Sequence, residues 1–275
     1  METPDIYSDI LDPFSGYAST LEELMNAHLN AMRTLPLFGD LSPQQVELLA
    51  AHSHLRKCDR GTYLFLHGET VRSFKVLCRG TIQLFRETPD GRESTIDILI
   101  AGDCVNAEEV LEPRETHLSS ARIVDDALVL EVPIKWLREN LEDFHRLAPR
   151  LLQGLAERLN EARLEAEHQS TMSATQMVAC YLQGLCVLYD FDPKGFELPY
   201  SKTLIASRLR MELATFSRTL HKLKDAGILV VGNRVSFTSL NKVSHFVCDT
   251  CSIAGDCPTH DTLSQAECFR DASRK

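Results

Sequence analysis

The sequence has little of what a membrane-embedded or secreted protein needs. Its apolar runs all fall well short of the ~18 residues that span a bilayer, so we expect no transmembrane helix. The N-terminal stretch Met1–Asp5 is acidic and lacks the basic and apolar segments of a secretory signal. These absences predict a cytoplasmic protein that makes no membrane contact.

Common catalytic patterns are also missing. The chain has no glycine-rich phosphate loop, no Ser/His/Asp arrangement and no paired carboxylates spaced for acid–base chemistry. We therefore predict that the protein is not an enzyme. A redox enzyme or electron carrier is the alternative from another functional class, and it would turn over without DNA.

What the sequence does contain fits a soluble globular protein of one large domain or two ordinary ones. It has 275 residues, of which 44% are hydrophobic and 25% are charged. The nine cysteines are an odd number in a chain predicted to be cytoplasmic. This argues against a disulfide framework and favours thiol, metal or redox chemistry.

The net charge of -10 is unevenly distributed. Residues 1–168 hold 17 Lys and Arg against 29 Asp and Glu (-12), and residues 246–275 hold 3 against 5 (-2). Residues 169–245 hold 9 against 5, which makes them basic (+4). A local basic block in an acidic chain indicates that this part meets a polyanion such as nucleic acid.

The pattern of apolar residues divides the chain into segments. Residues 1–33 read as an arm followed by a helix. Residues 34–133 contain short apolar runs separated by glycines and by the turn signal Pro89–Arg92, which predicts an all-β sandwich or roll. Residues 134–169 have helical spacing, interrupted at Pro149 and Gly154, which are expected to start or kink the main helix. A narrow apolar seam on so long a helix usually needs a partner helix. We predict a homodimer seam at Leu147, Leu151, Leu155 and Leu159; the alternative is a helix packed on its own domain.

Residues 170–245 have the pattern of a winged helix-turn-helix. Ser201 caps a short helix, a tight connection follows, and a second helix begins at Leu213. The dipeptide Gly232-Asn233 between two apolar runs predicts a two-residue hairpin, which is the wing. The exposed face of the second helix is predicted to carry Thr215, Ser217, Arg218, His221 and Lys222.

This order of elements resembles the bacterial CRP/FNR superfamily, named after the cyclic-AMP receptor and the fumarate and nitrate reduction regulator. The most specific segments are Leu198–Ala206 and Met211–Leu220, which look like the family's LP-x-S-x-x-x-IA and M-x-x-E-T-F-S-R-x-L signature. The resemblance covers residues 34–243. It implies an α+β fold with a jelly roll like that of cyclic-nucleotide-binding domains, a dimerisation helix and a DNA-binding domain. It also implies a homodimer on a two-fold-related double-stranded DNA site, and RNA polymerase as a partner.

The resemblance assigns DNA contacts to particular residues. In the signature the serine and the arginine contact DNA, which transfers these roles to Ser217 and Arg218. The signature's glutamate is replaced by Ala214, which cannot accept a hydrogen bond from cytosine N4. We therefore expect a half-site that differs from the family's usual one, or is relaxed, at that base pair. The other predicted contacts are Thr215 and His221, and the phosphate-binding Lys202, Arg208 and Lys222.

The β-roll departs from the cyclic-nucleotide members of the family. Those members carry a Gly-Glu pair and, further along, an arginine followed by Ser or Thr and Ala. Glu108 is a candidate for the glutamate, but Leu118 stands before Ser119, where the arginine belongs. A buried phosphate without a cationic fork is poorly stabilised, so we infer that cyclic AMP is not the effector. Arg122 in a shifted register leaves a small anionic ligand as an alternative.

Four of the nine cysteines form a C-terminal pattern over residues 246–275: Cys248-x2-Cys251-x5-Cys257-x10-Cys268. Pro258 follows Cys257, as often occurs where cysteine ligates an iron–sulfur cluster. We predict a [4Fe–4S] or [2Fe–2S] cluster on these four residues that senses redox state, oxygen or nitric oxide. A structural zinc site on the same ligands is the alternative, with a small-molecule effector in the β-roll. Unligated redox thiols or a disulfide are a third reading, and His245 and His260 are substitute ligands.

The remaining cysteines lie in or beside apolar runs. Because free cysteine behaves as a small buried hydrophobe, we expect these five to be structural. They are Cys58, Cys78, Cys104, Cys180 and Cys186.

Overall fold

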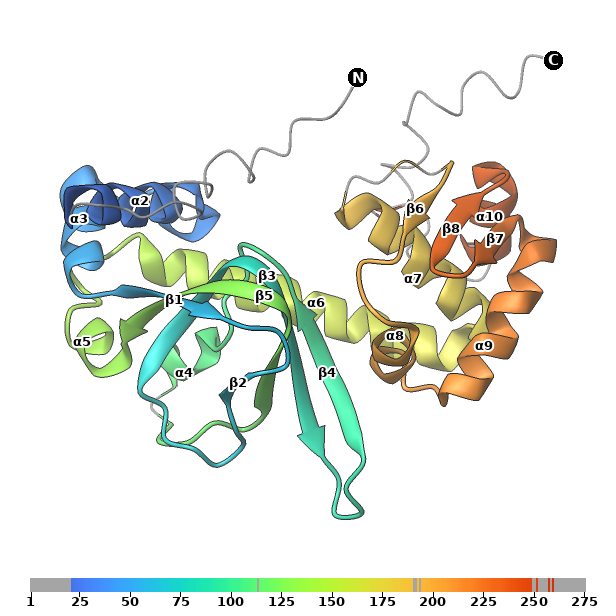
Figure 1. Ribbon diagram of the computed structural model, residues 1–275, viewed down its shortest axis with the longest axis horizontal. Helices are drawn as coiled ribbons and strands as arrows, with labels where there is room; N and C mark the ends of the chain where they lie inside the picture. Colours follow the sequence, from blue (N-terminus) through green and yellow to red (C-terminus); the bar gives the residue numbers. More distant parts are fainter. Residues whose placement is uncertain are drawn as a thin grey trace. The chain divides into compact units, whose positions relative to one another are not determined.

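The computed structural model describes residues 21–112, 114–189, 192, 194–248, 251, 257 and 259. The chain divides into two compact units, Met1–Leu159 and Asn160–Lys275 (Figure 1). An N-terminal β domain, a long helix and a C-terminal helix-turn-helix domain confirm the predicted α+β fold. Within the described ranges, no helix is long and apolar enough to cross a bilayer.

The first unit begins with helices and continues into one antiparallel sheet. The helices are α2 (Leu21–Thr34), η2 (Pro36–Phe38) and α3 (Pro43–Ala51). The strands are β1 (His54–Cys58), β2 (Tyr63–Phe65), β3 (Ser73–Glu87), β4 (Glu93–Leu99) and β5 (Ser120–Pro133), and α4 (Ala107–Leu111) lies between the last two. The strand order is β1-β5-β3-β4, and β2 also pairs with β5.

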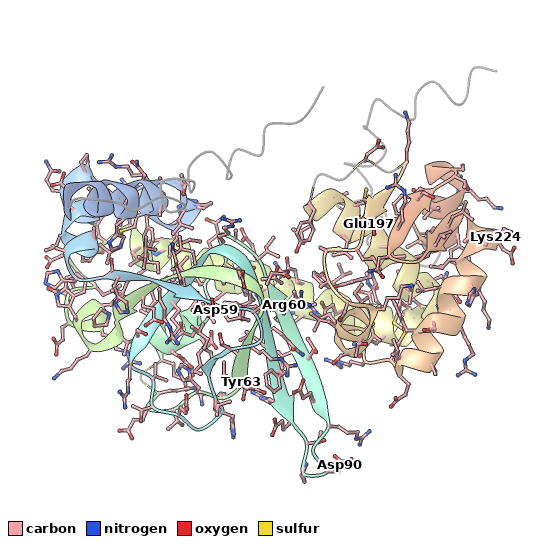
Figure 2. The ribbon with its side chains drawn as sticks, viewed as in Figure 1. Asp59, Arg60, Tyr63, Asp90, Glu197 and Lys224 are labelled. Carbon is pink, nitrogen blue, oxygen red and sulfur yellow. The ribbon has the colours of Figure 1, made fainter. Side chains whose placement is uncertain are left out.

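The predicted hairpin turn at Pro89–Arg92 is confirmed. It joins β3 to β4, and Asp90 lies at its tip (Figure 2). The Gly91 N–H donates to the carbonyl of Thr88 at 2.8 Å, and Gly91 has a positive φ of 79°. The turn therefore uses the glycine that its sequence pattern requires.

The strands are longer than the sequence pattern predicts, because a glycine bends β3 without ending it. Gly80 has φ 95°, and an added Cβ would lie 2.6 Å from the carbonyl oxygen of Asp126 and 2.8 Å from the Cα of Ala127. The pairing of β3 with β5 shifts register on both sides of Gly80. Glycine at such a bulge allows close backbone approach, so the two apolar runs read as separate strands are one continuous strand.

The helical stretch predicted over residues 134–169 is two helices. These are α5 (Ile134–Glu139) and α6 (Leu147–Thr171). The Asn140 side chain donates to the Trp136 carbonyl at 2.8 Å where α5 ends, and the buried Phe144 lies in the turn that follows. Arg158 pairs with Asp97 at 2.6 Å, which holds the first part of α6 against the β domain.

The predicted dimer seam needs correction at two positions. Leu147 and Leu151 are 0% and 1% exposed and belong to the core that this protomer forms with Phe144. Because they are covered by their own chain, they cannot contact a second one. Leu155 is packed partly against the same core, whereas Leu159 is exposed. The unpredicted Leu152 is exposed as well.

The second unit holds the winged helix. Its elements after α6 are α7 (Ala174–Leu188), β6 (Phe196–Glu197), α8 (Lys202–Arg208), α9 (Leu213–Lys222), η3 (Leu223–Ala226), β7 (Ile228–Val231), β8 (Arg234–Phe237) and α10 (Leu240–Cys248). The strand order is β6-β8-β7, and Gly232-Asn233 makes the predicted hairpin between β7 and β8. The fully buried Ile205, Phe216 and Leu223 connect α8, α9 and η3 through one core.

Candidate DNA-binding surface and thiol site

The helix-turn-helix connection is fixed by local hydrogen bonds. The Ser201 hydroxyl accepts from the Leu204 N–H at 3.2 Å, which caps α8 as predicted. After α8 the backbone of Arg210 takes a left-handed φ of 55°, and the Met211 N–H donates to the Ala206 carbonyl at 2.8 Å. These contacts turn the chain within a few residues and start α9 at Leu213.

The two faces of α9 differ in polarity. Phe216, Thr219 and Leu220 are buried against the unit. On the remaining surface, Arg218, His221 and Lys222 are exposed, and Thr215 and Ser217 are half-buried. The residues predicted to contact DNA from α9 are therefore accessible, while Phe216 and Leu220 face inward.

Arg218 is held along the surface of its own helix. Its Nε donates to the Ala214 carbonyl at 3.3 Å and its Nη2 donates to the Thr215 hydroxyl at 3.2 Å. The guanidinium is thus directed toward the first turn of α9, the end of a recognition helix that reaches base edges. Thr215 acts here as a positioning residue for Arg218.

Arg208 does not belong to the accessible surface. Its Nη1 donates to Oε2 of Glu165 on α6 at 2.8 Å, and its Nη2 pairs with the other carboxylate oxygen. The Arg208 side chain is only 17% exposed. Since Glu165 satisfies the guanidinium that the sequence assigned to a phosphate, we remove Arg208 from the predicted DNA contacts. Lys202 at the start of α8 is half-buried, and Lys222 is exposed.

The interior of the β domain contains a buried polar network. The His117 Nδ1 lies 2.8 Å from the Glu109 carboxylate, and the Asn106 amide donates to the same carboxylate at 2.5 Å. The Phe65 ring stacks on the His117 ring with centroids 3.7 Å apart, and the Nζ of the buried Lys75 lies 5.4 Å from the Phe65 ring centroid. Burial lowers the pKa of Lys75. No sequence pattern marks this network, because its members are scattered over β2, β3, α4 and the loop before β5.

Glu108 and Arg122 are the two residues that the sequence offers to an anionic ligand in the β-roll. Burial raises the pKa of Glu108, which disfavours its charged form. Arg122 donates from Nη1 to Glu93 at 2.8 Å and from Nη2 to Gln83 at 2.7 Å. The Arg122 guanidinium, which would have to bind the phosphate, is therefore already paired within the sheet.

The C-terminal cysteines begin at the end of α10. Cys248 is the last residue of that helix, and the Cys251 N–H donates to its carbonyl at 3.0 Å. We call Cys248, Cys251 and Cys257 the thiol site; all three are half-buried, and Cys268 lies outside the described residues. The Cys251 Sγ lies 3.6 Å from Nε2 of His168, at the end of α6.

A further thiol, Cys180, lies on α7 and is half-buried. Burial raises its pKa to about 12, and negative charge on Cys257, Cys248 and Cys251 adds to this rise. The described cysteines form no disulfides with one another, and among the described residues no three His, Cys, Asp or Glu side chains are grouped to hold a metal ion. The set is still rich in soft sulfur donors, which suit zinc or an iron–sulfur cluster.

Comparison with known proteins bears on both units. Residues 55–143 match the cyclic nucleotide-binding domain and residues 176–245 match the Crp-like helix-turn-helix domain. The chain is 28% identical over 210 residues to the cyclic AMP receptor protein of Thermus thermophilus, an alignment of 73% of this chain and 91% of that protein. It is 27% identical over 180 residues to the fumarate and nitrate reduction regulatory protein of Vibrio cholerae (62% of this chain, 69% of that one).

A solved structure shares the fold. FixK2 from Bradyrhizobium japonicum superposes with a TM-score of 0.62 at 18% identity, covering 70% of this chain and 96% of that one. The signature segments, the winged helix and these matches agree with one another. The chain therefore belongs to the CRP/FNR family of DNA-binding transcription regulators, and it is not an enzyme, as its sequence predicted.

Proposed function

We propose that this regulator binds two-fold-related DNA as a homodimer and that an iron–sulfur cluster on its C-terminal cysteines sets its DNA affinity. The observation that carries the second part is the close spacing of Cys248, Cys251 and Cys257 in the sequence, with the Cys251 Sγ 3.6 Å from Nε2 of His168, in the unit that also holds the helix-turn-helix. The regulator has RNA polymerase as a further partner. It acts in the cytoplasm, where DNA and RNA polymerase lie.

Sequence is read by the exposed face of α9. Arg218 presents a planar fork that matches guanine O6 and N7, an interaction worth about 1–3 kcal/mol of discrimination. Ser217 donates or accepts at a neighbouring base edge, while His221, Lys202 and Lys222 add contacts along the backbone. Ala214 supplies no acceptor at its position, so we expect the half-site to differ there from sites read by a glutamate.

Dimerisation uses a stripe of α6 that keeps Leu155 and Leu159 of the predicted seam and adds Leu152 in place of the buried Leu147 and Leu151. Leu152 and Leu159 are 57% and 51% exposed, and Leu155 lies between them with part of its side chain accessible. Ala162 and Ala166 continue this stripe at alternating spacings of three and four residues. Such heptad spacing is that of a two-stranded coiled coil. The two recognition helices then meet half-sites about one helical turn apart.

The cysteines supply the ligands that a cluster requires. Thiolates hold iron–sulfur clusters, and the half-burial of this site limits solvent while leaving it reachable by oxygen or nitric oxide. When bound, the iron–sulfur cluster would provide the signal, either through a change in its charge or through its loss from the protein. The chain can transmit that signal to the DNA-binding helix, because α10, which ends at Cys248, packs against α7, and α7 packs against α9.

The test is anaerobic purification of the full-length chain, followed by iron and sulfide analysis and a visible spectrum. We expect iron and sulfide in comparable amounts, and a DNA affinity at fixed salt that changes when air is admitted. Zinc in place of iron would overturn the cluster.

A structural zinc site is the second candidate, favoured by the same thiols. It would leave sensing to a small-molecule effector in the β-roll, whose interior holds the buried pair of Glu109 and His117. In that case Cys251→Ser would unfold the tail and leave any redox response unchanged.

A further inference from the structure

We propose that the last turns of α6 position the helix-turn-helix: Glu165 and Gln169 hold two arginines next to the connection between α8 and α9, and thereby place α9 for reading bases. Both are positioning residues, which act through Arg208 and Arg210 and do not themselves contact DNA. This role rests on the part of the proposed function in which α9 reads bases. It is independent of the cluster and of the dimer seam.

Two side-chain contacts attach the start of this connection to the end of α6, within the second unit (Figure 1). Arg208, the last residue of α8, donates from Nη1 to Glu165 at 2.8 Å and from Nη2 to the other carboxylate oxygen. Arg210, in the connection, donates from Nη1 to Oε1 of Gln169 at 3.0 Å. Glu165 and Gln169 are four residues apart, so they lie one turn apart on one face of α6. The chain is therefore held at two points as it leaves α8.

The contact of Arg208 with Glu165 fixes an orientation as well as a distance. A guanidinium that donates to both oxygens of a carboxylate has one favoured geometry. The Arg208 side chain is 17% exposed and that of Glu165 is 38% exposed, so water weakens this pair less than it weakens a pair on an open surface. The last residue of α8 therefore has a defined orientation relative to α6.

The backbone of Arg210 has a conformation that favours glycine. Its φ is 55°, and within the described ranges it is the one non-glycine residue with a positive φ. Glycine adopts this conformation without the strain that a Cβ introduces, but it has no side chain to reach Gln169. Strained residues persist where the surrounding structure holds them, and they cluster at functional sites. The contact with Gln169 gives an arginine a role at this position that glycine could not fill.

The first turn of α9 depends on the connection for its position. Further along α9, Phe216 and Leu220 are buried against the unit. Residues 212–214 at the start of the helix are exposed, so burial does little to hold this end. Arg218 donates to a carbonyl of this first turn, and groups that recognise a ligand need to be held within about 0.5 Å. A loosened connection would therefore displace the guanidinium that reads bases.

The expected signature is a loss of sequence preference without a loss of phosphate contacts. Contacts with phosphates supply the non-specific affinity and its salt dependence, whereas contacts with base edges supply the sequence preference. A residue that only stabilises the fold would lower the melting temperature and leave the DNA affinity of the folded protein unchanged. A residue that positions α9 would lower the affinity for the specific site alone.

The experiment measures binding of the full-length protein to two duplexes of equal length by fluorescence anisotropy. One duplex carries the site that the wild-type protein selects from random DNA, and the other carries a scrambled sequence. Gln169→Ala removes the acceptor of Arg210 and changes no charge. We expect this variant to bind the selected site at least about fivefold more weakly, the loss that one mismatched base pair causes. It should bind the scrambled duplex with wild-type affinity and salt dependence, and Gln169→Glu, which keeps an acceptor, should bind both duplexes as the wild type does.

Arg210→Gly separates positioning from stability. Glycine relieves the left-handed backbone, so the melting temperature should not fall, while affinity for the selected site should fall as in Gln169→Ala. The double variant should lose no more than either single variant, because both substitutions remove the same contact. The matched control is Gln153→Ala, since Gln153 is an exposed glutamine of α6 that donates to Glu157 within the first unit.

Three outcomes overturn the positioning role. The first is wild-type affinity of folded Gln169→Ala for the selected site. The second is an equal loss on both duplexes, or a smaller salt dependence in Arg210→Gly, because Arg210 would then be a phosphate contact. The third is failure of base reading itself, which is seen in the wild-type protein alone as the selection of no site from random DNA, and which overturns both proposals.

Discussion

Arg208 of α8 donates to both carboxylate oxygens of Glu165 on α6, and this pair fixes the short helix of the helix-turn-helix to the C-terminal part of α6. The guanidinium is 17% exposed and the carboxylate 38%. One turn further along α6, His168 contacts Cys251. A single face of α6 therefore touches both the DNA-binding motif and the thiol site, and it assigns Arg208 a structural role.

The role of Arg208 can be separated from that of a phosphate-binding residue by salt dependence. Each phosphate contact contributes about 0.9 to the slope of log affinity against log salt concentration. We expect Lys222→Gln to reduce that slope by about one contact and Arg208→Gln to leave it unchanged, as measured by fluorescence anisotropy at four salt concentrations. A reduced slope for Arg208→Gln would return this residue to the DNA interface.

Arg218 is expected to carry base discrimination. Arg218→Ala removes a bidentate donor and should weaken specific binding by about 1–3 kcal/mol, which is about 5- to 150-fold, while relaxing the preference at one base pair. Thr215→Val should have a smaller effect in the same direction, because it removes only the hydroxyl that holds Nη2. Selection of binding sites from random DNA gives both readouts. Lys135→Ala, at an exposed position in the other unit, is the control.

These variants test features that were predictable from sequence to different degrees. The helix-turn-helix and the wing were predictable because their signals are local. Ser201 caps its own helix, and Gly232-Asn233 between two apolar runs is typical of a two-residue hairpin. The sequence pattern separates the apolar runs on either side of Gly80 into two strands, whereas β3 continues through this glycine. A glycine that ends a strand and a glycine that bends one look alike in sequence. The bend is decided by the close approach of Asp126 and Ala127, which no local pattern records.

The candidate sites depend on contacts between distant residues, which one sequence does not reveal. Glu165 and Arg208 are 43 residues apart, and Cys251 and His168 are 83 apart. The spacing of the C-terminal cysteines identified the three members of the thiol site, but not the contact of Cys251 with His168. Leu147 and Leu151 have helical spacing whether their partner is a second chain or, as here, their own core.

The revised dimer stripe gives a direct test of assembly. Leu159→Glu places a charge on an exposed apolar position of α6 and should shift the protein from dimer to monomer in analytical ultracentrifugation at micromolar concentration. DNA affinity should fall with it, because one half-site contributes far less than two. Leu188→Glu changes a leucine of similar exposure on α7 and should remain dimeric. Dimeric Leu159→Glu, or monomeric Leu188→Glu, would place the interface elsewhere.

The core of the β domain should make stability fall in alkaline solution. Burial raises the pKa of the Cys78 thiol to about 12, whereas an unfolded chain has cysteine near about 8.5. Between these values the unfolded state binds fewer protons than the folded one, so the free energy of unfolding decreases as pH rises. The slope approaches about 1.4 kcal/mol per pH unit for this thiol. Urea unfolding of the wild-type protein and of Cys78→Ala at pH 7 and pH 10 measures this effect. The variant should have a lower free energy of unfolding at pH 7, but its free energy of unfolding should fall less between pH 7 and pH 10. Equal losses in both proteins would show that the Cys78 thiol ionises freely in the folded state.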